Sequence, residues 1–245
     1  MLWQNPLLRY HCHEPFEAWY WGDGHQESTV SAALRHPMCV ASGERVDATT
    51  IEGQPGLVIK EMCFQMDRPA FEFLASLATR PLVFVVRDPR LSIVSRLRIV
   101  QELDGASTFT PEHSGWDSLL LQLQWCRMLH IPYLIVDTQR LRQQPERQAS
   151  ALMAGLQLPM EGLATQWSQR TGLQLCSPEV GALMSEVRTG SDPFYRRVLA
   201  SSGIQPPDDI DLSDCQRQID AAGLRDQADS WLRAYRGLQD DPRML

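Results

Sequence analysis

Blocks of apolar residues divide the chain into segments with the period of a strand and segments with the period of a helix. Short apolar runs of the kind that form buried strands lie at 7–12, 56–60, 81–87 and 131–137. Apolar residues at helical spacing occupy 68–79, 91–103, 116–129 and 145–158. Strands that alternate with helices predict a parallel sheet with helices on both of its faces.

The rest of the chain has a weaker pattern. Residues 17–55 are predicted to be largely irregular, with one helix near 28–35. The C-terminal part is predicted to be helical, apart from the turn-rich stretch SSGIQPPDDIDLSD, and to end in a helix over roughly 213–237. The closing QDDPRML is predicted to fray, because termini with few apolar residues are poorly ordered.

No linker interrupts this order, so the sequence predicts one domain over residues 1–245. Its α/β core is expected at about 7–170 and its helical part at about 171–238. A chain of this length can bury one sizeable core.

Composition narrows the class of protein. A formal net charge of −7 argues against a general nucleic-acid binder, which would carry a basic stripe. No apolar run is long enough to span a bilayer, and the first residues do not form a signal peptide. The six cysteines show no C-x-x-C spacing, which predicts reduced thiols rather than a zinc site. We therefore expect a cytoplasmic protein without a membrane or nucleic-acid partner.

Polar residues stand at the carboxyl ends of the predicted strands, where ligands bind in open parallel sheets. These are Glu14, Lys60, Arg87 and Asp137. Lys60 is also the only lysine among the 23 basic residues of the chain. Its isolation singles it out; the alternative explanation is chance.

Arg87 leaves its strand where a helix is predicted to begin, with Asp88 as N-cap and Pro89 at the first helical position. An anion there would accept forked hydrogen bonds from the Arg87 guanidinium. The positive end of the helix dipole would stabilise its negative charge. Ser95, about two turns into the helix, could donate its hydroxyl to the same anion. The alternative is an ion pair between Arg87 and a neighbouring carboxylate such as Asp88, with Ser95 solvated.

The run Arg87-Asp88-Pro89-Arg90, with Ser95 eight residues after Arg87, resembles the 3′-phosphate-binding segment of sulfotransferases that use PAPS (3′-phosphoadenosine-5′-phosphosulfate). The order of HEPF, VIKE and this run resembles a bacterial branch of the family. The resemblance covers about residues 7–170. It implies a three-layer α/β fold like that of the P-loop NTPases.

The resemblance also implies roles. Arg87 and Ser95 would hold the 3′-phosphate of PAPS, and Glu14 would be the catalytic base that takes the proton of an acceptor hydroxyl. Lys60 would offset negative charge at the transferring sulfonate. Glu61 follows Lys60, so the histidine of the animal cytosolic enzymes is absent. The expected reaction is sulfonate transfer from PAPS to a small-molecule acceptor, without a metal. From the residues alone, Glu14 could instead cap a turn.

The Gly-rich loop with which the family grips the 5′-phosphosulfate is expected a helix upstream of HEPF, where only a few residues precede the first strand. Either the sequence is part of a longer reading frame, or it is a short homologue without that loop. The alternative function is therefore a non-catalytic or truncated protein that binds an anionic nucleotide or a protein partner. A P-loop kinase is disfavoured, because no G-x-x-x-x-G-K-[ST] occurs.

Acceptor specificity is expected to depend on residues 17–55 and on the C-terminal third of the chain. Aromatic residues of these regions could line an apolar pocket or serve ordinary packing: Trp19, Tyr20, Trp21, Phe194 and Tyr195. His11 and His13 alternate with Cys12 and would face one side of the first strand, either as part of a metal site or as polar groups in a pocket wall.

Overall fold

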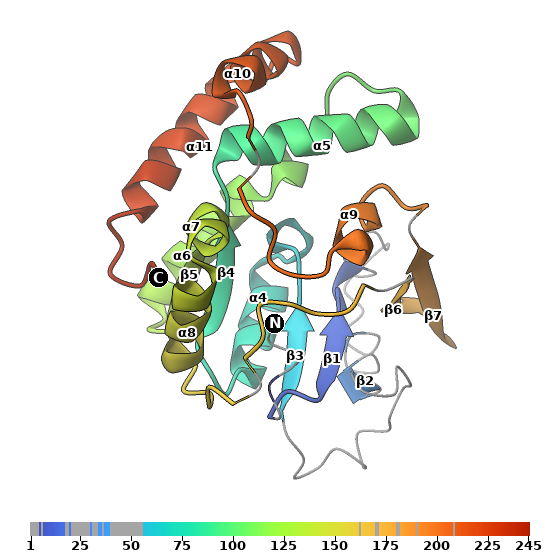
Figure 1. Ribbon diagram of the computed structural model, residues 1–245, viewed down its shortest axis with the longest axis vertical. Helices are drawn as coiled ribbons and strands as arrows, with labels where there is room; N and C mark the ends of the chain where they lie inside the picture. The colour runs from blue at the N-terminus through green and yellow to red at the C-terminus, as the bar shows by residue number, and fades with distance from the viewer. Residues whose placement is uncertain are drawn as a thin grey trace. The chain divides into compact units, whose positions relative to one another are not determined.

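The computed structural model describes residues 5, 7–17, 20, 30, 34–35, 37–39, 56–161, 163–169, 172–179, 182–189, 191–207 and 209–245. They belong to two compact units. The first unit comprises residues 1–70 and 158–203, and the second comprises 71–157 and 204–245. Strands and helices occur together in the chain (Figure 1), which confirms the expected α/β class.

The first unit contains a three-stranded sheet in the order β2-β1-β3. Its strands are β1 (Tyr10–His13), β2 (Met38–Cys39) and β3 (Leu57–Lys60). β1 is parallel to β3, with His13 opposite Lys60, and antiparallel to β2. The parallel register brings the carboxyl ends of β1 and β3 to one edge. The 3-10 helix η2 (Cys63–Gln65) follows β3.

A hairpin in the first unit corrects the expectation of helix after residue 171. β6 (Gly172–Glu179) and β7 (Ala182–Thr189) pair antiparallel along their full length. The polar Gln174 separates the apolar residues Leu173 and Leu175, which fits the two-residue period of a strand. Helix resumes only at α9 (Arg196–Ala200).

The second unit is built on two parallel strands, β4 (Leu82–Val86) and β5 (Tyr133–Asp137), which pair in register. All four helices expected between residues 68 and 158 are confirmed, and an additional short helix, α7, follows β5. The helices are α4 (Arg68–Leu77, whose first residues belong to the first unit), α5 (Pro89–Asp104), α6 (Trp116–Met128), α7 (Thr138–Gln143) and α8 (Pro145–Gly155). A further 3-10 helix, η3 (Pro111–Ser114), precedes α6.

The start of α5 matches the sequence prediction. Asp88 is the N-cap and accepts a hydrogen bond from the backbone N–H of Arg90 at 2.9 Å, with Pro89 as the first helical residue. The helix ends at Gly105, whose φ of 67° lies in the left-handed region that favours glycine.

The predicted last helix is two helices, α10 (Leu212–Ala221) and α11 (Arg225–Leu238). The break lies at Gly223, which has a φ of 72°. Both helices pack on α5, as Figure 1 shows. Trp231 is almost fully buried, and its indole N–H donates to Asp117 at 2.7 Å. The expectation that this region packs back on the domain core holds within the second unit.

The C-terminal tail does not fray. Met244 forms a parallel bridge with Ile135 in the middle of β5. The backbone N–H of Ile135 donates to the carbonyl of Arg243 at 2.9 Å, and that of Leu245 donates to the carbonyl of Ile135 at 3.0 Å. The tail therefore extends the two-stranded sheet beside β5.

In the part of the chain that the structure describes, no helix has the length and apolar character needed to cross a membrane.

Candidate functional site

Glu14 and Lys60 meet at the carboxyl edge of β1 and β3. The backbone N–H of Glu14 donates to the carbonyl of Lys60 at 2.7 Å, which continues the parallel pairing by one residue. The Lys60 ammonium donates to Glu14 Oε1. Glu14 has a φ of 50°, a left-handed conformation that costs a residue with a side chain roughly 1–2 kcal/mol. The structure thus brings together the two residues that the sequence assigns to catalysis.

Two further side chains hold the Glu14 carboxylate. His13 Nε2 lies 3.3 Å from Glu14 Oε1. The side-chain amide of Gln65, which is buried, donates to Glu14 Oε2 at 3.3 Å. Tyr195, the residue before α9, places its hydroxyl 3.2 Å from His13 Nε2. Glu14 therefore lies in a cluster built from β1, β3, η2 and the segment before α9.

The environment of Glu14 favours its ionised form. Burial raises the pKa of Glu14, but the hydrogen bond from His13 and the charge and hydrogen bond of Lys60 outweigh it, and the pKa falls to about 2. Glu14 therefore carries its charge at any pH near neutrality. In the Glu14–Lys60 pair the carboxylate is the buried member, whereas the Lys60 side chain is 40% exposed.

A second carboxyl group, Glu61, behaves in the opposite way. Its two oxygens accept hydrogen bonds from the backbone N–H groups of Phe16 at 2.8 Å and Met62 at 2.7 Å. Burial, with a contribution from the charge on Glu14, raises the pKa of Glu61 to about 8 despite these donors. At neutral pH one carboxyl group is charged and its neighbour holds a proton. Divergent pKa values of this kind are typical of acid–base pairs in active sites.

Gln65 and Glu61 are site residues that sequence reasoning missed. Glu61 was noted only as the residue that stands in place of a histidine, and Gln65 carries no strand-end signal. Gln65 reaches Glu14 only because η2 folds the chain back after β3. Cys63, in the same turn, is an unreactive thiol, because burial raises its pKa to about 12.

Of the two histidines of β1, His13 lies in this cluster. His11 and His13 are both buried, and His13 contacts Glu14 and Tyr195. A group of three or more His, Cys, Asp or Glu side chains suited to a metal ion is not found among the described residues.

Arg87 and Ser95 belong to the second unit. Arg87 is half-buried directly after β4, and Ser95 is half-buried in α5. The Asp88 carboxylate binds Arg90 through two hydrogen bonds, 3.0 Å from Nε and 2.6 Å from Nη2. This ion pair neutralises the Asp88 carboxylate at the start of α5.

Asp137, the fourth strand-end residue, has a structural role. Its side chain is buried and caps α7 by accepting from the backbone N–H groups of Gln139 and Arg140. The Tyr235 hydroxyl donates to its other oxygen at 2.5 Å, and the Gln239 amide donates to the same oxygen at 2.8 Å. With four donors on one carboxylate, Asp137 fixes α11 to the end of β5.

The aromatic residues expected to contact an acceptor are only partly described. Trp19 and Trp21 lie outside the described residues. Tyr20 packs edge-on against Phe64, with ring centroids 5.4 Å apart. Phe194 is exposed, and the adjacent Tyr195 joins the Glu14 cluster through His13. Of the three that the structure describes, Tyr195 has the most direct link to the predicted base.

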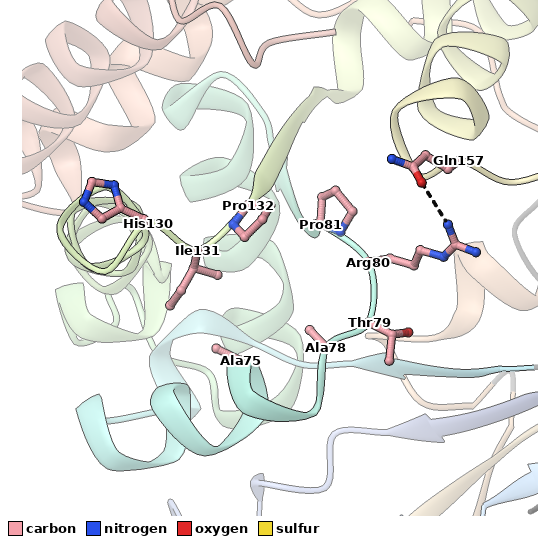
Figure 2. Close-up of a pocket in the computed structure, with 9 residues that line it drawn as sticks. All are labelled: Ala75, Ala78, Thr79, Arg80, Pro81, His130, Ile131, Pro132 and Gln157. Carbon is pink, nitrogen blue, oxygen red and sulfur yellow. Dashed lines mark hydrogen bonds between the residues drawn. The ribbon is translucent and has the colours of Figure 1, made fainter.

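A pocket of about 440 Å³ lies elsewhere in the second unit. Figure 2 shows its lining residues: Ala75, Ala78, Thr79, Arg80, Pro81, His130, Ile131, Pro132 and Gln157. Pro81 and Pro132 precede β4 and β5, so the pocket lies at the amino ends of these strands, opposite to Arg87. Arg80 donates to Gln157 across it at 3.4 Å. None of the predicted site residues lines this pocket.

Comparison with known proteins gives no assignment: no protein-family model, curated protein or solved structure matches the chain.

Proposed function

We propose that this chain is a sulfotransferase-like protein that transfers a sulfonate group from PAPS to a hydroxyl of a small-molecule acceptor. The proposed framework is a three-layer α/β fold of the P-loop-NTPase type, in a bacterial, cytoplasmic protein. The observation that carries the proposal is the Glu14–Lys60 pair, an ionised carboxylate beside a cation at the carboxyl ends of two parallel strands. A base and a cation at one point are the two groups that sulfonate transfer requires.

The chemistry follows from these two side chains. The acceptor oxygen attacks sulfur and forms a new S–O bond, while its proton passes to the Glu14 carboxylate. The bond between sulfur and the bridging phosphate oxygen breaks, and its electron pair leaves on PAP (3′-phosphoadenosine-5′-phosphate). Lys60 stabilises the negative charge that develops on this leaving oxygen. All atoms and charges balance without a further reactant.

The proposal assigns the 3′-phosphate of PAPS to Arg87 and Ser95. One observation supports an anion at the start of α5: Arg90 neutralises the Asp88 carboxylate there, so this carboxylate does not oppose a bound phosphate. Arg87 would supply a forked donor, and Ser95 a hydroxyl from the same helix. When bound, PAPS supplies the activated sulfonate.

A second candidate function is a non-catalytic protein that binds an anionic nucleotide or a protein partner. One observation favours it: three donors, from Lys60, His13 and Gln65, already bind the Glu14 carboxylate. A carboxylate with a pKa of about 2 is also a weak proton acceptor. These are the properties of a structural ion pair.

The test measures PAP binding and sulfonate transfer separately. By calorimetry, we expect Arg87→Ala to weaken PAP binding by about 10- to 100-fold, since it removes hydrogen bonds to a charged group. Arg80→Ala, at the opposite end of the strands, is the matched control and should bind PAP as the wild type does. With ³⁵S-labelled PAPS and a panel of hydroxyl acceptors, Glu14→Gln should abolish transfer without affecting PAP binding.

Unchanged PAP affinity in Arg87→Ala would refute the phosphate assignment. PAP binding without transfer to any acceptor would favour the non-catalytic alternative.

A further inference from the structure

His13 Nε2 stands between two oxygens. Glu14 Oε1 lies 3.3 Å from it, and the Tyr195 hydroxyl lies 3.2 Å from it. The His13 ring is buried and tilted by 55° against the Tyr195 ring, with centroids 5.8 Å apart. The position of this one nitrogen is therefore determined by a base on one side and a phenol on the other.

The charge of Glu14 determines the tautomer of His13. An ionised carboxylate can only accept hydrogen bonds, so a bare Nε2 lone pair at 3.3 Å would face it with repulsion. Nε2 must therefore carry a hydrogen, which the Glu14 oxygen and the Tyr195 oxygen can share. The hydroxyl of Tyr195 suits this place because it can accept a hydrogen bond as well as donate one.

The two oxygens of Glu14 are then unequal. Oε1 has two donors, Lys60 Nζ and His13 Nε2, which match its two lone pairs. Among the residues that the structure describes, Oε2 has one donor, the Gln65 amide. The oxygens of Glu61, a second carboxyl group near Glu14, accept from backbone donors. Oε2 is thus the oxygen of Glu14 with a lone pair left for a proton.

We propose that Tyr195 is a positioning residue that acts through His13 to fix Oε1 of Glu14, so that Oε2 is the atom that takes the proton of the acceptor. The inference rests on the proposed function for its chemical meaning. The hydrogen-bonded chain from Tyr195 through His13 to Glu14 does not depend on that function, and it can be tested on its own. Loss of the Tyr195 hydroxyl leaves His13 with one oxygen partner fewer and loosens the carboxylate.

The first test reads the His13 tautomer and needs no activity. Long-range ¹H–¹⁵N NMR spectra of ¹⁵N-histidine-labelled protein at pH 7.5 are assigned with His13→Gln. We expect the Nε2–H tautomer in the wild type and in Tyr195→Phe, because Glu14 still faces Nε2 in the variant. The Nε2 shift should change in Tyr195→Phe, because the Nε2 hydrogen loses one of its two acceptors. Tyr133→Phe is the matched control, because it also removes a hydrogen-bonded phenol hydroxyl, but one that binds Arg127. An Nδ1–H tautomer in the wild type, or unchanged shifts in Tyr195→Phe, would overturn the inference.

The second test is kinetic and separates positioning from packing. If the wild type transfers sulfonate, Tyr195→Phe should lower kcat about tenfold, the loss of roughly one hydrogen bond of 1.4 kcal/mol. Its KM for PAPS should stay within about twofold, and Tyr133→Phe should keep the wild-type kcat. A wild-type kcat in Tyr195→Phe would refute the positioning role. If the wild type transfers nothing, the proposed function fails, whereas the NMR result still decides the hydrogen-bonded chain. A Tyr195→Phe variant that fails to fold leaves the wild-type tautomer as the deciding observation.

Discussion

Replacing Glu14 by glutamine should destabilise the protein at neutral pH and much less in acid. The variant keeps the size of the side chain and removes its charge, and with it the attraction to Lys60 and His13. The pKa of Glu14 falls from 4.5 to about 2 on folding. At about 1.4 kcal/mol for each pH unit, the difference corresponds to about 3 kcal/mol of stability. Solvent screens part of this attraction, because the Lys60 side chain is 40% exposed. We therefore expect a loss of about 1–2 kcal/mol at pH 7.

The pH dependence distinguishes this cause from a general packing defect. A carboxyl group whose pKa is lowered on folding contributes its full stability above its unfolded pKa of 4.5, and the contribution is lost as the pH falls through about 2. The difference between wild type and Glu14→Gln should be constant from pH 7 to about pH 5, and less than half of it should remain at pH 3. Urea unfolding followed by tryptophan fluorescence measures it at each pH.

The control for this experiment is Glu112→Gln, which removes the charge of an exposed carboxylate in η3. Its effect should stay within about 0.5 kcal/mol at every pH. If Glu14→Gln destabilises the protein equally at pH 7 and pH 3, the charge of Glu14 does not contribute to the stability of the fold. The reasoning about its ionisation would then be wrong.

Two further predictions test other parts of the chain. Since the pKa of Glu61 is raised to about 8, the folded state holds an extra proton between about pH 4.5 and 8. The free energy of unfolding of the wild type should therefore fall with rising pH in this window, by up to about 1.4 kcal/mol per pH unit. Urea unfolding of Glu61→Gln should show no such fall. If stability depends on pH in the variant as it does in the wild type, Glu61 does not hold the proton. Deletion of residues 241–245 removes the 2.8 Å ion pair of Asp241 with Arg127 and two backbone hydrogen bonds of Ile135, and should cost about 1–3 kcal/mol. A Tm equal to that of the full chain would show instead that the tail frays.

Local signals in the sequence predicted most of the α/β framework. The start of α5 is the clearest case, because a capping carboxylate at Asp88 and the fixed φ of Pro89 act within two residues of each other. The break between α10 and α11 was missed, because helical spacing continues on both sides of it. A local signal for it was nevertheless present, since Gly223 favours the left-handed conformation that ends helices. Features set by neighbouring residues were thus accessible from sequence alone.

Features set by distant pairing were not accessible. The tail appeared unstructured because nothing near Met244 indicates that its partner is Ile135, more than 100 residues earlier. Glu14 and Lys60 are the exception. Both stand at strand ends, and one rule about ligand sites in parallel sheets predicted them together. Gln65 reaches Glu14 through a turn, and Tyr195 reaches His13 from a segment far along the chain. No residue pattern encodes either contact.

The energetics of the Glu14 cluster argue that it is more than a stabilising ion pair. A left-handed φ at Glu14 costs about 1–2 kcal/mol, and removing a carboxylate from water costs several kcal/mol before any partner offsets it. Buried ion pairs often only recover such costs, and apolar residues of similar volume stabilise a fold as well or better. The neighbouring Glu61 adds a second carboxyl group, which can remain there at neutral pH only by keeping its proton. The cluster combines a strained backbone, a buried charge and two carboxyl groups of opposite protonation. Features of this kind are concentrated in active sites. The Glu14 cluster is therefore where a test of activity should begin.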